Sequence, residues 1–510
     1  MKKEQRLVKT IKNLVLSWMG YFAVILSTFI GRKIFVMSIG SDYLGVSGLF
    51  TNILSCLNLA DLGLSVAITY SLYQPIAEKD YEKIKSIMKV FHKMYMYIGC
   101  IVGIIGITLT PFLYCFINDS PSSITYEKIQ LYYLLFVINN ALTYFLYYKS
   151  VLINADQRQY IVELNYSFSI IGMTIVQIFV LILFKNYTLY LLVQIAFTII
   201  KNLVISYIAD KNYPFLKEKN VRKLSNSEKK EITKGVSGMM FQKIGTVIVN
   251  STDNVLISKF INLSLVGLYT NYYSIINALN MLLNQVFRSA LASVGNLNVT
   301  ASKNELYNVF KKSLFINFWI HGFTSICLTC LFNPFVKLWL GDKYLLEFSV
   351  VLILGINFFF NGMRQTCLMY NDALGLYWEN RYKPIAEALI NLLFSLILLH
   401  FYGLIGIFLG TLCSILFVCV WYEPYIIFKT ALNIPIKEYL KKYFEYVIVT
   451  FITGLITFFF CYSVKMTGIF SFIILCIICM FVPNTLFLIY YNKSDEFRYF
   501  FDLVKNKILK

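Results

Sequence analysis

The sequence predicts an all-α membrane protein that crosses the bilayer about fourteen times. Of its 510 residues, 58% are hydrophobic and only 14% are charged, which is too apolar for the surface of a soluble protein of this length. Four charge-free runs (94–118, 164–184, 388–422 and 468–491) each exceed the ~20 residues that a helix needs to span the hydrocarbon. Only helices and closed barrels satisfy their backbones in lipid, and barrel strands alternate in hydrophobicity. These uninterrupted runs therefore predict helices.

The predicted spans follow one another with short loops between them. They cover residues 13–39, 44–73, 94–117, 129–148, 161–184, 188–209, 236–260, 265–296, 313–338, 346–370, 384–400, 404–427, 444–464 and 468–491. The first span follows a basic N-terminus, as a secretory signal would. It runs on past Arg32 to about Ile39, which is too long for a signal h-region, so we interpret it as a retained span.

The net charge of +19 is explained by the distribution of Lys and Arg between the two sides of the membrane. With the N-terminus in the cytoplasm, the segments on that side hold 34 of the 46 Lys and Arg residues, and the outer loops hold six. This asymmetry follows the positive-inside rule, and an even number of spans returns the C-terminus to the cytoplasm. The basic character therefore requires no nucleic-acid partner.

Two segments of the chain repeat one another. Gly48–Asn58 reads GLFTNILSCLN and Gly267–Asn277 reads GLYTNYYSIIN, with six identities in eleven positions. The copies are six predicted spans apart, so they cross the membrane in the same direction and indicate a parallel repeat. The predicted organisation is an N-lobe (1–210), a basic cytoplasmic linker (211–235), a C-lobe (236–428) and a C-terminal pair of spans with a cytoplasmic tail (429–510), each lobe having six helices.

Polar residues form stripes on several predicted spans, including the tenth (Asn357, Asn361 and Arg364) and the eleventh (Glu387, Asn391 and Ser395). In the eighth span they recur at intervals of three, four or seven, which places them on one helical face: Asn271, Ser274, Asn277, Asn284 and Arg288. Interhelical hydrogen bonds, worth ~0.6 kcal/mol each, explain most Asn and Ser residues of this kind. Substrate contact is the alternative, and Asn277 and Asn284 are the candidates for it.

Charged residues inside the spans need another explanation, because Arg or Lys at the bilayer centre costs ~2.5–3.5 kcal/mol or more. The cations are Arg32, Lys201, Lys243, Arg288 and Arg364, whereas the acids counted at this depth are Asp61 and Asp253. Lys201 lies toward a span end, where its side chain can reach water. For the others we predict a water-filled central cavity of positive potential, with local ion pairs such as Asp61 with Arg32 as the alternative.

A cationic cavity suits an anionic substrate, because Arg grips phosphate through a planar fork of donors. An exporter of cationic drugs would need carboxylates instead. The sequence has no GxxxxGK[ST], HExxH or GxSxG motif, so no enzymatic activity is predicted. The CxxC pairs Cys327–Cys330 and Cys476–Cys479 lie in apolar runs without a nearby His or acidic partner. They are interpreted as small hydrophobic residues, and neither a metal nor a cofactor is predicted.

Three segments carry a resemblance to a known family: Tyr43–Pro75, Gly245–Leu297 and Gly362–Ser395. They resemble the Wzx-type polysaccharide flippases of the multidrug/oligosaccharidyl-lipid/polysaccharide exporter (MOP) superfamily. The resemblance covers the first twelve spans, and the terminal pair fits the fourteen-span members. It implies a flippase that moves undecaprenyl-diphosphate-linked oligosaccharide repeat units across the bacterial cytoplasmic membrane by alternating access. The units would serve synthesis of O-antigen (lipopolysaccharide), capsule or exopolysaccharide.

The resemblance also implies where the substrate binds. Arg32, Arg288 and Arg364 lie in or beside matching segments and are candidates for the diphosphate or glycan, with Lys243 adding to the cationic cavity. Asp61 and Asp253 are candidates for coupling to a proton or sodium gradient. Membrane lipids surround the protein, and a polysaccharide polymerase and a chain-length regulator are the expected protein partners.

Three other functions compete with this prediction. A lipid II flippase of cell-wall synthesis also handles an undecaprenyl diphosphate. A MATE-type cation or drug exporter shares the superfamily, but a basic cavity disfavours it. A membrane glycosyltransferase or polymerase would need a large catalytic outer loop, and the outer loops here are short.

Overall fold

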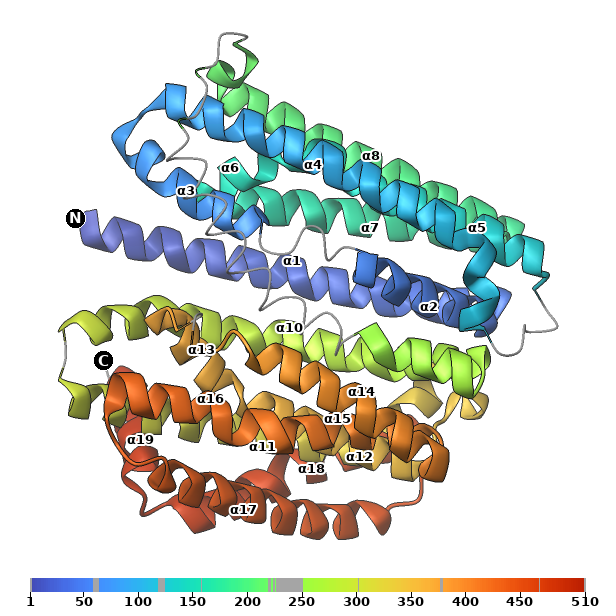
Figure 1. Cartoon of the computed structure of the whole chain (residues 1–510). Coiled ribbons are helices and arrows are strands. Elements are labelled where there is room, and N and C mark those ends of the chain that lie inside the picture. The colour runs from blue at the N-terminus through green and yellow to red at the C-terminus, as the bar shows by residue number, and fades with distance from the viewer. Residues whose placement is uncertain are drawn as a thin grey trace. The chain divides into compact units, whose positions relative to one another are not determined.

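The computed structural model describes residues 2–57, 64–117, 124–156, 158–218, 222, 225, 251–300, 302–376, 379–466 and 468–508. All regular structure in these residues is helical, and this confirms the predicted all-α class (Figure 1). The chain divides into two compact units, Met1–Gly267 and Leu268–Lys510. The first unit thus extends beyond the predicted linker, which lies largely outside the described residues.

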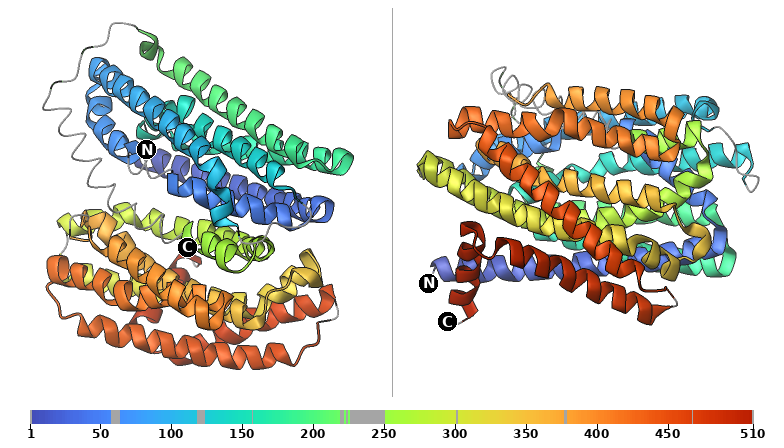
Figure 2. Two further views of the ribbon diagram at one scale, coloured as in Figure 1. Left: turned by 45° about the vertical axis from the view of Figure 1, so that its right-hand side comes forward. Right: turned by 90° about the horizontal axis from the view of Figure 1, so that it is seen from below.

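Unit 1 is built from long helices joined by short turns. Its helices are α1 (Lys2–Ile39), α2 (Asp42–Leu57), α3 (Leu64–Glu78), α4 (Tyr81–Leu109), α5 (Tyr126–Tyr147), α6 (Lys149–Ala155), α7 (Gln159–Phe184) and α8 (Tyr187–Asn212), with 3-10 turns η2 (Thr110–Phe116) and η3 (Pro214–Lys217). Residues 251–260 are also helical. Within the unit, α4, α5, α7 and α8 pack side by side, as the views of Figures 1 and 2 agree.

Unit 2 begins within α10 (Leu263–Thr300) and contains more interrupted helices. They are α11 (Lys303–Trp339), α12 (Phe348–Met363), α13 (Gln365–Leu374), α14 (Lys383–Tyr402), α15 (Leu404–Ser414), α16 (Val420–Ile427), α17 (Lys437–Tyr462), α18 (Ile469–Tyr491) and α19 (Asp495–Ile508), with a 3-10 turn η4 (Asp342–Tyr344). Two π-helical turns, η5 (Ile415–Cys419) and η6 (Phe428–Leu432), flank α16.

Nine helical stretches among the described residues are long and apolar enough to cross a membrane, and the bent pair α5–α6 makes a tenth candidate. They coincide with predicted spans 1, 3, 5, 6, 9 and 11–14, and with span 4 for the bent pair. Predicted spans 2 and 10 are each divided into two shorter helices, α2 with α3 and α12 with α13. Most of predicted span 7 lies outside the described residues. The total of fourteen therefore stays a prediction.

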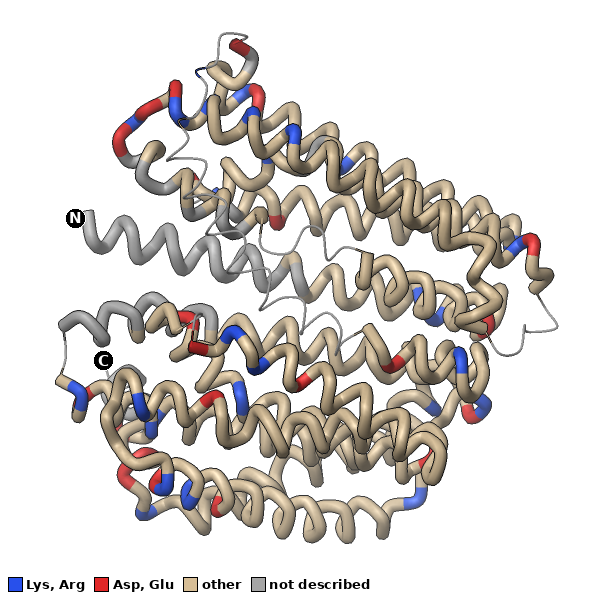
Figure 3. Tube along the Cα trace, viewed as in Figure 1, with Lys and Arg blue, Asp and Glu red and all other residues tan. Residues whose placement is uncertain are grey.

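The surfaces of the candidate spans suit lipid. Large apolar side chains on α7, α17 and α18 are exposed, for example Phe179, Phe459 and Phe470. Figure 3 shows Lys, Arg, Asp and Glu gathered near the helix ends of unit 1, and the charges of α4 all precede residue 94. Exposed apolar side chains in this number would be unfavourable in water, so these faces are expected to contact acyl chains.

Small residues let helices approach closely in both units. A Cβ atom at Gly31 on α1 would lie 2.7 Å from the Cγ2 atom of Thr174 on α7. A Cβ at Gly410 on α15 would lie 2.4 Å from the main-chain nitrogen of Ser395 on α14. Larger side chains would force these pairs apart. Close packing of small residues is the usual means of association where lipid supplies no hydrophobic drive.

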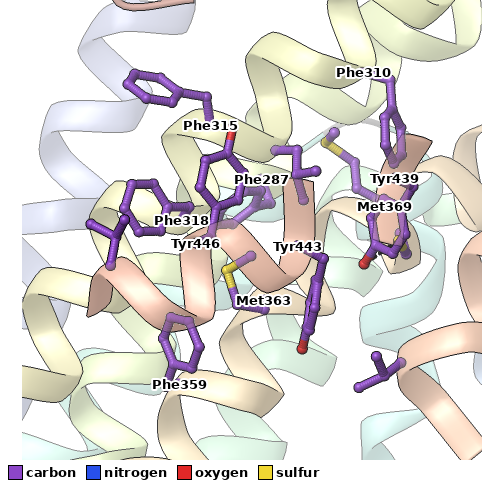
Figure 4. Close-up of a cluster of buried hydrophobic side chains, with 14 of the residues drawn as sticks. Phe287, Phe310, Phe315, Phe318, Phe359, Met363, Met369, Tyr439, Tyr443 and Tyr446 are labelled. Carbon is purple, nitrogen blue, oxygen red and sulfur yellow. Dashed lines mark hydrogen bonds between the residues drawn. The ribbon is translucent and has the colours of Figure 1, made fainter. Parts of the chain in front are cut away.

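The core of unit 2 is aromatic. Phe318 on α11 stacks on Tyr446 of α17, with ring centroids 4.3 Å apart. Phe287 of α10, Phe359 and Met363 of α12 and Tyr443 of α17 are buried in the same cluster (Figure 4). This cluster fixes α17 against α11 and α12, and Met363 directly precedes the charged site described next.

Candidate functional site

Four charged side chains meet inside unit 2 and form an ion cluster of Arg364, Lys383, Glu387 and Glu423. Arg364 Nη1 donates to Glu387 Oε1 at 2.9 Å and Arg364 Nη2 donates to Glu423 Oε1 at 2.7 Å. Lys383 Nζ lies 2.8 Å from Glu387 Oε2 and 2.6 Å from Glu423 Oε1. Each cation thus contacts both carboxylates.

Irregular helix geometry positions these four side chains. Arg364 is the single residue between α12 and α13, where the predicted tenth span is divided. Two residues earlier, Gly362 lets the His321 ring of α11 approach, since a Cβ there would lie 2.0 Å from His321 Cδ2. Glu423 is on α16 between the two π-helical turns, a feature frequent at functional sites.

Lys383 and Glu387 are one helical turn apart at the start of α14, an i, i+4 pair. A cation at a helix N-terminus is unfavourable by itself, because the helix dipole presents positive charge there. Here two carboxylates neutralise it. The cluster therefore holds the start of α14, the α12–α13 break and α16 together.

The ion cluster is neutral and nearly sealed. It has two cations and two anions, and the exposed fractions of its side chains are 11% for Arg364, 8% for Lys383, 9% for Glu387 and 1% for Glu423. Removing such charges from water is tolerable only when partners replace the lost hydration. At the edge of the cluster, Arg364 Nη1, which donates to Glu387, also donates to Oδ1 of the exposed Asn361 at 3.2 Å.

For Arg364 the structure therefore agrees with the alternative of local ion pairs and not with the preferred water-filled cationic cavity. The acids counted in the sequence at this depth, Asp61 and Asp253, did not include its partners Glu387 and Glu423. A signal for the missing partner was present, since Glu423 is the sole acidic residue of the apolar stretch 404–432. Contact of Arg364 with substrate stays a prediction, because the structure contains no substrate.

The other predicted site residues lie on separate elements. Arg32 is half-buried on α1 in unit 1, where Tyr190 of α8 is a near polar neighbour. On α10, Asn277 is exposed and Asn284 is half-buried. Arg288 also lies on α10, but its side chain is outside the described part of the chain, as are Asp61 and Lys243 entirely. Their roles stay predictions.

The structure describes the surroundings of Asp253 in unit 1. It lies in the helical residues 251–260, and its Oδ1 atom is buried without a hydrogen bond from any described residue. Oδ1 of the adjacent Asn254 is in the same condition. A buried carboxylate oxygen without a donor is a group that a proton or a cation could satisfy, which makes Asp253 Oδ1 the atom of interest here.

Several polar residues of the predicted stripes make interhelical hydrogen bonds. Asn357 of α12 donates to the Phe408 carbonyl of α15 at 2.9 Å. Asn391 and Ser395 of α14 donate to Thr411 Oγ1 at 3.1 Å and to the Ile407 carbonyl at 3.0 Å. These side chains hold α15 in place, as the packing interpretation of such stripes predicts.

Comparison with known proteins identifies solved structures that share this fold. No protein-family model matches the chain, and no curated protein matches it by sequence. Among solved structures, the lipid II flippase MurJ in an inward closed conformation aligns with a TM-score of 0.67 and 15% identity, covering 94% of this chain and 99% of that one. An inward-facing multidrug resistance MATE transporter of the MOP superfamily aligns with a TM-score of 0.64 and 15% identity, covering 80% and 96%.

The chain has the fold of MOP superfamily transporters. A further MOP transporter, from Pyrococcus furiosus and described as having a binding pocket of reversed polarity, aligns with a TM-score of 0.55 and 15% identity over 82% of this chain and 96% of that one. The fold agrees with the superfamily that the sequence segments predicted, and membership of that superfamily stays a prediction. The Wzx branch of it stays a prediction.

Proposed function

We propose that this chain is a flippase that moves undecaprenyl-diphosphate-linked oligosaccharide repeat units across the cytoplasmic membrane by alternating access. The observation that carries the proposal is the MOP fold, matched over 94% of this chain by a lipid flippase and over 80% by a MATE transporter. The cations Arg32, Lys243 and Arg288 support an anionic, diphosphate-bearing substrate over a small cation.

The proposed substrate contacts follow from the chemistry of the diphosphate. Arg32, Lys243 and Arg288 bind its oxygens through charge-assisted hydrogen bonds, and Asn277 and Asn284 contact the glycan. Arg364 contributes differently from the other cations, because its charge is balanced within the ion cluster. It holds the break between α12 and α13, and its Asn361-facing edge is the part left for substrate.

Asp253 is the proposed coupling residue, and substitution tests this role. Asp253→Asn should abolish the stimulation of transport by an imposed proton or sodium gradient, because an amide neither binds a proton at neutral pH nor carries the charge that attracts a cation. Transport without a gradient should persist. The measurement is the initial rate in proteoliposomes with and without each gradient.

The exposed Asp342 supplies a matched control. It pairs with Lys337 at a helix end, and Asp342→Asn should leave gradient stimulation unchanged. Equal stimulation of wild type and Asp253→Asn would remove Asp253 from the coupling mechanism. The proposed role of Asp61 would then become the one to test.

A lipid II flippase is the second candidate, and the high coverage of the MurJ structure favours it. The two functions differ in their genetics. A lipid II flippase would be essential and would complement depletion of the resident one. A repeat-unit flippase would be dispensable for growth and would act with the proposed polymerase and chain-length regulator.

Gene deletion tests the proposed function. Loss of the protein should leave undecaprenyl-linked repeat units on the cytoplasmic leaflet and abolish surface polymer. Growth rate and drug susceptibility should stay as in the parent strain. Normal polymer in a deletion strain that lacks any second flippase would overturn the proposal. Drug hypersensitivity with intact polymer would instead favour the exporter.

A further inference from the structure

Three cysteine thiols from three different helices converge inside unit 2. Cys330 is on α11, Cys461 is the second-last residue of α17 and Cys479 is on α18. Their sulfur atoms all lie within 4.8 Å of one another, and the Sγ atoms of Cys461 and Cys479 are 3.6 Å apart. The exposed fractions are 8%, 7% and 1% in chain order. The sequence could not show this thiol triad, because Cys461 belongs to neither CxxC pair.

We propose that the thiol triad binds a monovalent soft metal ion, Cu(I). Thiolate sulfur is the ligand type that selects Cu(I). Three sulfurs each about 2.3 Å from a central ion, the length of a zinc–thiolate bond, would lie about 4.0 Å apart in a planar triangle. The 3.6 Å between Cys461 Sγ and Cys479 Sγ is close to that value, and no pair of the three sulfurs is more than 4.8 Å apart, so small side-chain adjustments suffice.

The number and kind of ligands favour Cu(I) over the common alternative metals. Zinc in structural sites takes four ligands, and no His or carboxylate joins the three thiols among the described residues. Calcium and magnesium take oxygen ligands. Cu(I) is satisfied by three sulfurs in a trigonal arrangement, which is what α11, α17 and α18 present.

Charge is the main cost of binding an ion in this apolar interior. Free thiols are neutral, so the triad carries no buried charge before binding. Thiolate is the ligand form of cysteine, so each sulfur that binds Cu(I) releases its proton to solvent. With Cu(I) bound, two thiolates leave a net charge of −1 and three leave −2. A monovalent ion at the triad therefore needs the site to lie near the end of a span, and Cys461 is the second-last residue of α17.

The position of the triad determines which helices a bound ion would hold together. Cys461 lies in the last turn of α17, shortly before the connection to α18. Cys327, one turn before Cys330 on α11, is held beside the triad by donating to the Cys479 carbonyl at 3.6 Å. A bound ion would cross-link the C-terminal helices α17 and α18 to α11.

Competition titration tests the site on the full-length protein. Reduced protein in detergent, kept anaerobic, is titrated with Cu(I) against a colorimetric Cu(I) chelator. Wild type should compete for the ion, and Cys461→Ser should bind it at least about tenfold more weakly, since even losses outside the ligand shell have such effects. Cys413→Ser, a half-buried cysteine of the same unit on α15, should match wild type.

Two further measurements do not depend on how the variant folds. X-ray absorption of copper-loaded wild type should show sulfur ligands only, and Cu(I) should raise its thermal unfolding temperature, because the ion binds the folded state. Equal competition by wild type and Cys461→Ser, or a copper spectrum with nitrogen ligands, would overturn the proposal. So would a Cys461–Cys479 disulfide found by peptide mass spectrometry after alkylation in intact cells.

Discussion

Replacing Glu423 with Gln should destabilise the folded protein by about 3–5 kcal/mol, the cost of removing one partner from a buried ion pair. Glu423 is 1% exposed and lies within 2.7 Å of Arg364 Nη2 and 2.6 Å of Lys383 Nζ. Without its charge, two buried cations would share Glu387 alone. Thermal unfolding in detergent, followed by intrinsic fluorescence, measures the effect as a lower midpoint and a smaller yield of monodisperse protein.

The same chemical change at an exposed carboxylate provides the control. Glu347 at the start of α12 is exposed, and Glu347→Gln should leave the midpoint within error of wild type. A double substitution, Arg364→Gln with Glu423→Gln, should cost less than the two single changes added together, because each single change leaves an uncompensated charge. Additive effects, or an unchanged midpoint for Glu423→Gln, would show that the ion cluster does not stabilise unit 2.

Arg288→Ala should reduce transport by about 10–100-fold while leaving the amount of folded protein unchanged. A hydrogen bond to a charged group contributes about 1.5–3 kcal/mol, and 1.4 kcal/mol corresponds to a factor of ten. Arg288→Lys should retain part of the activity, because lysine keeps the charge but loses the planar fork. The rate of flipping in proteoliposomes, normalised to the folded protein, is the measurement.

Arg158 serves as the control arginine for the Arg288→Ala experiment. It is half exposed before α7 and pairs with Asp156 at 3.1 Å, so Arg158→Ala should transport at the wild-type rate. If Arg288→Ala also transports at that rate, the assignment of Arg288 to the diphosphate is wrong even if the flippase proposal stands. Arg364→Ala should not give a selective loss of transport, because it would also leave Glu387 and Glu423 with Lys383 alone.

The sequence predicted the features that depend on local hydrophobicity. Uninterrupted apolar runs predicted helices such as α7 and α18, because the bilayer requires both the length and the internal hydrogen bonding. The polar stripes on α12 and α14 were interpreted as packing contacts, and Asn357 and Ser395 make such contacts.

Features that depend on long-range approach could not be predicted. Hydropathy treats the stretch 346–370 as one helix, whereas the structure interrupts it at Arg364, where Gly362 packs against His321 and the guanidinium reaches α14 and α16. The partner Glu423 lies 59 residues from Arg364, and no sequence spacing relates the two. The thiol triad depends in the same way on three helices meeting.

Movement of an undecaprenyl-diphosphate glycolipid between leaflets by the purified protein is the most direct test of the proposed function. The test uses proteoliposomes loaded with the repeat-unit lipid extracted from the producing strain, and scores the glycan exposed to a membrane-impermeant oxidant. We predict that exposure rises with time in proteoliposomes but not in protein-free vesicles, and that it is slower for a monophosphate carrier. Vesicles that leave the lipid in place but accumulate a cationic dye would contradict the account.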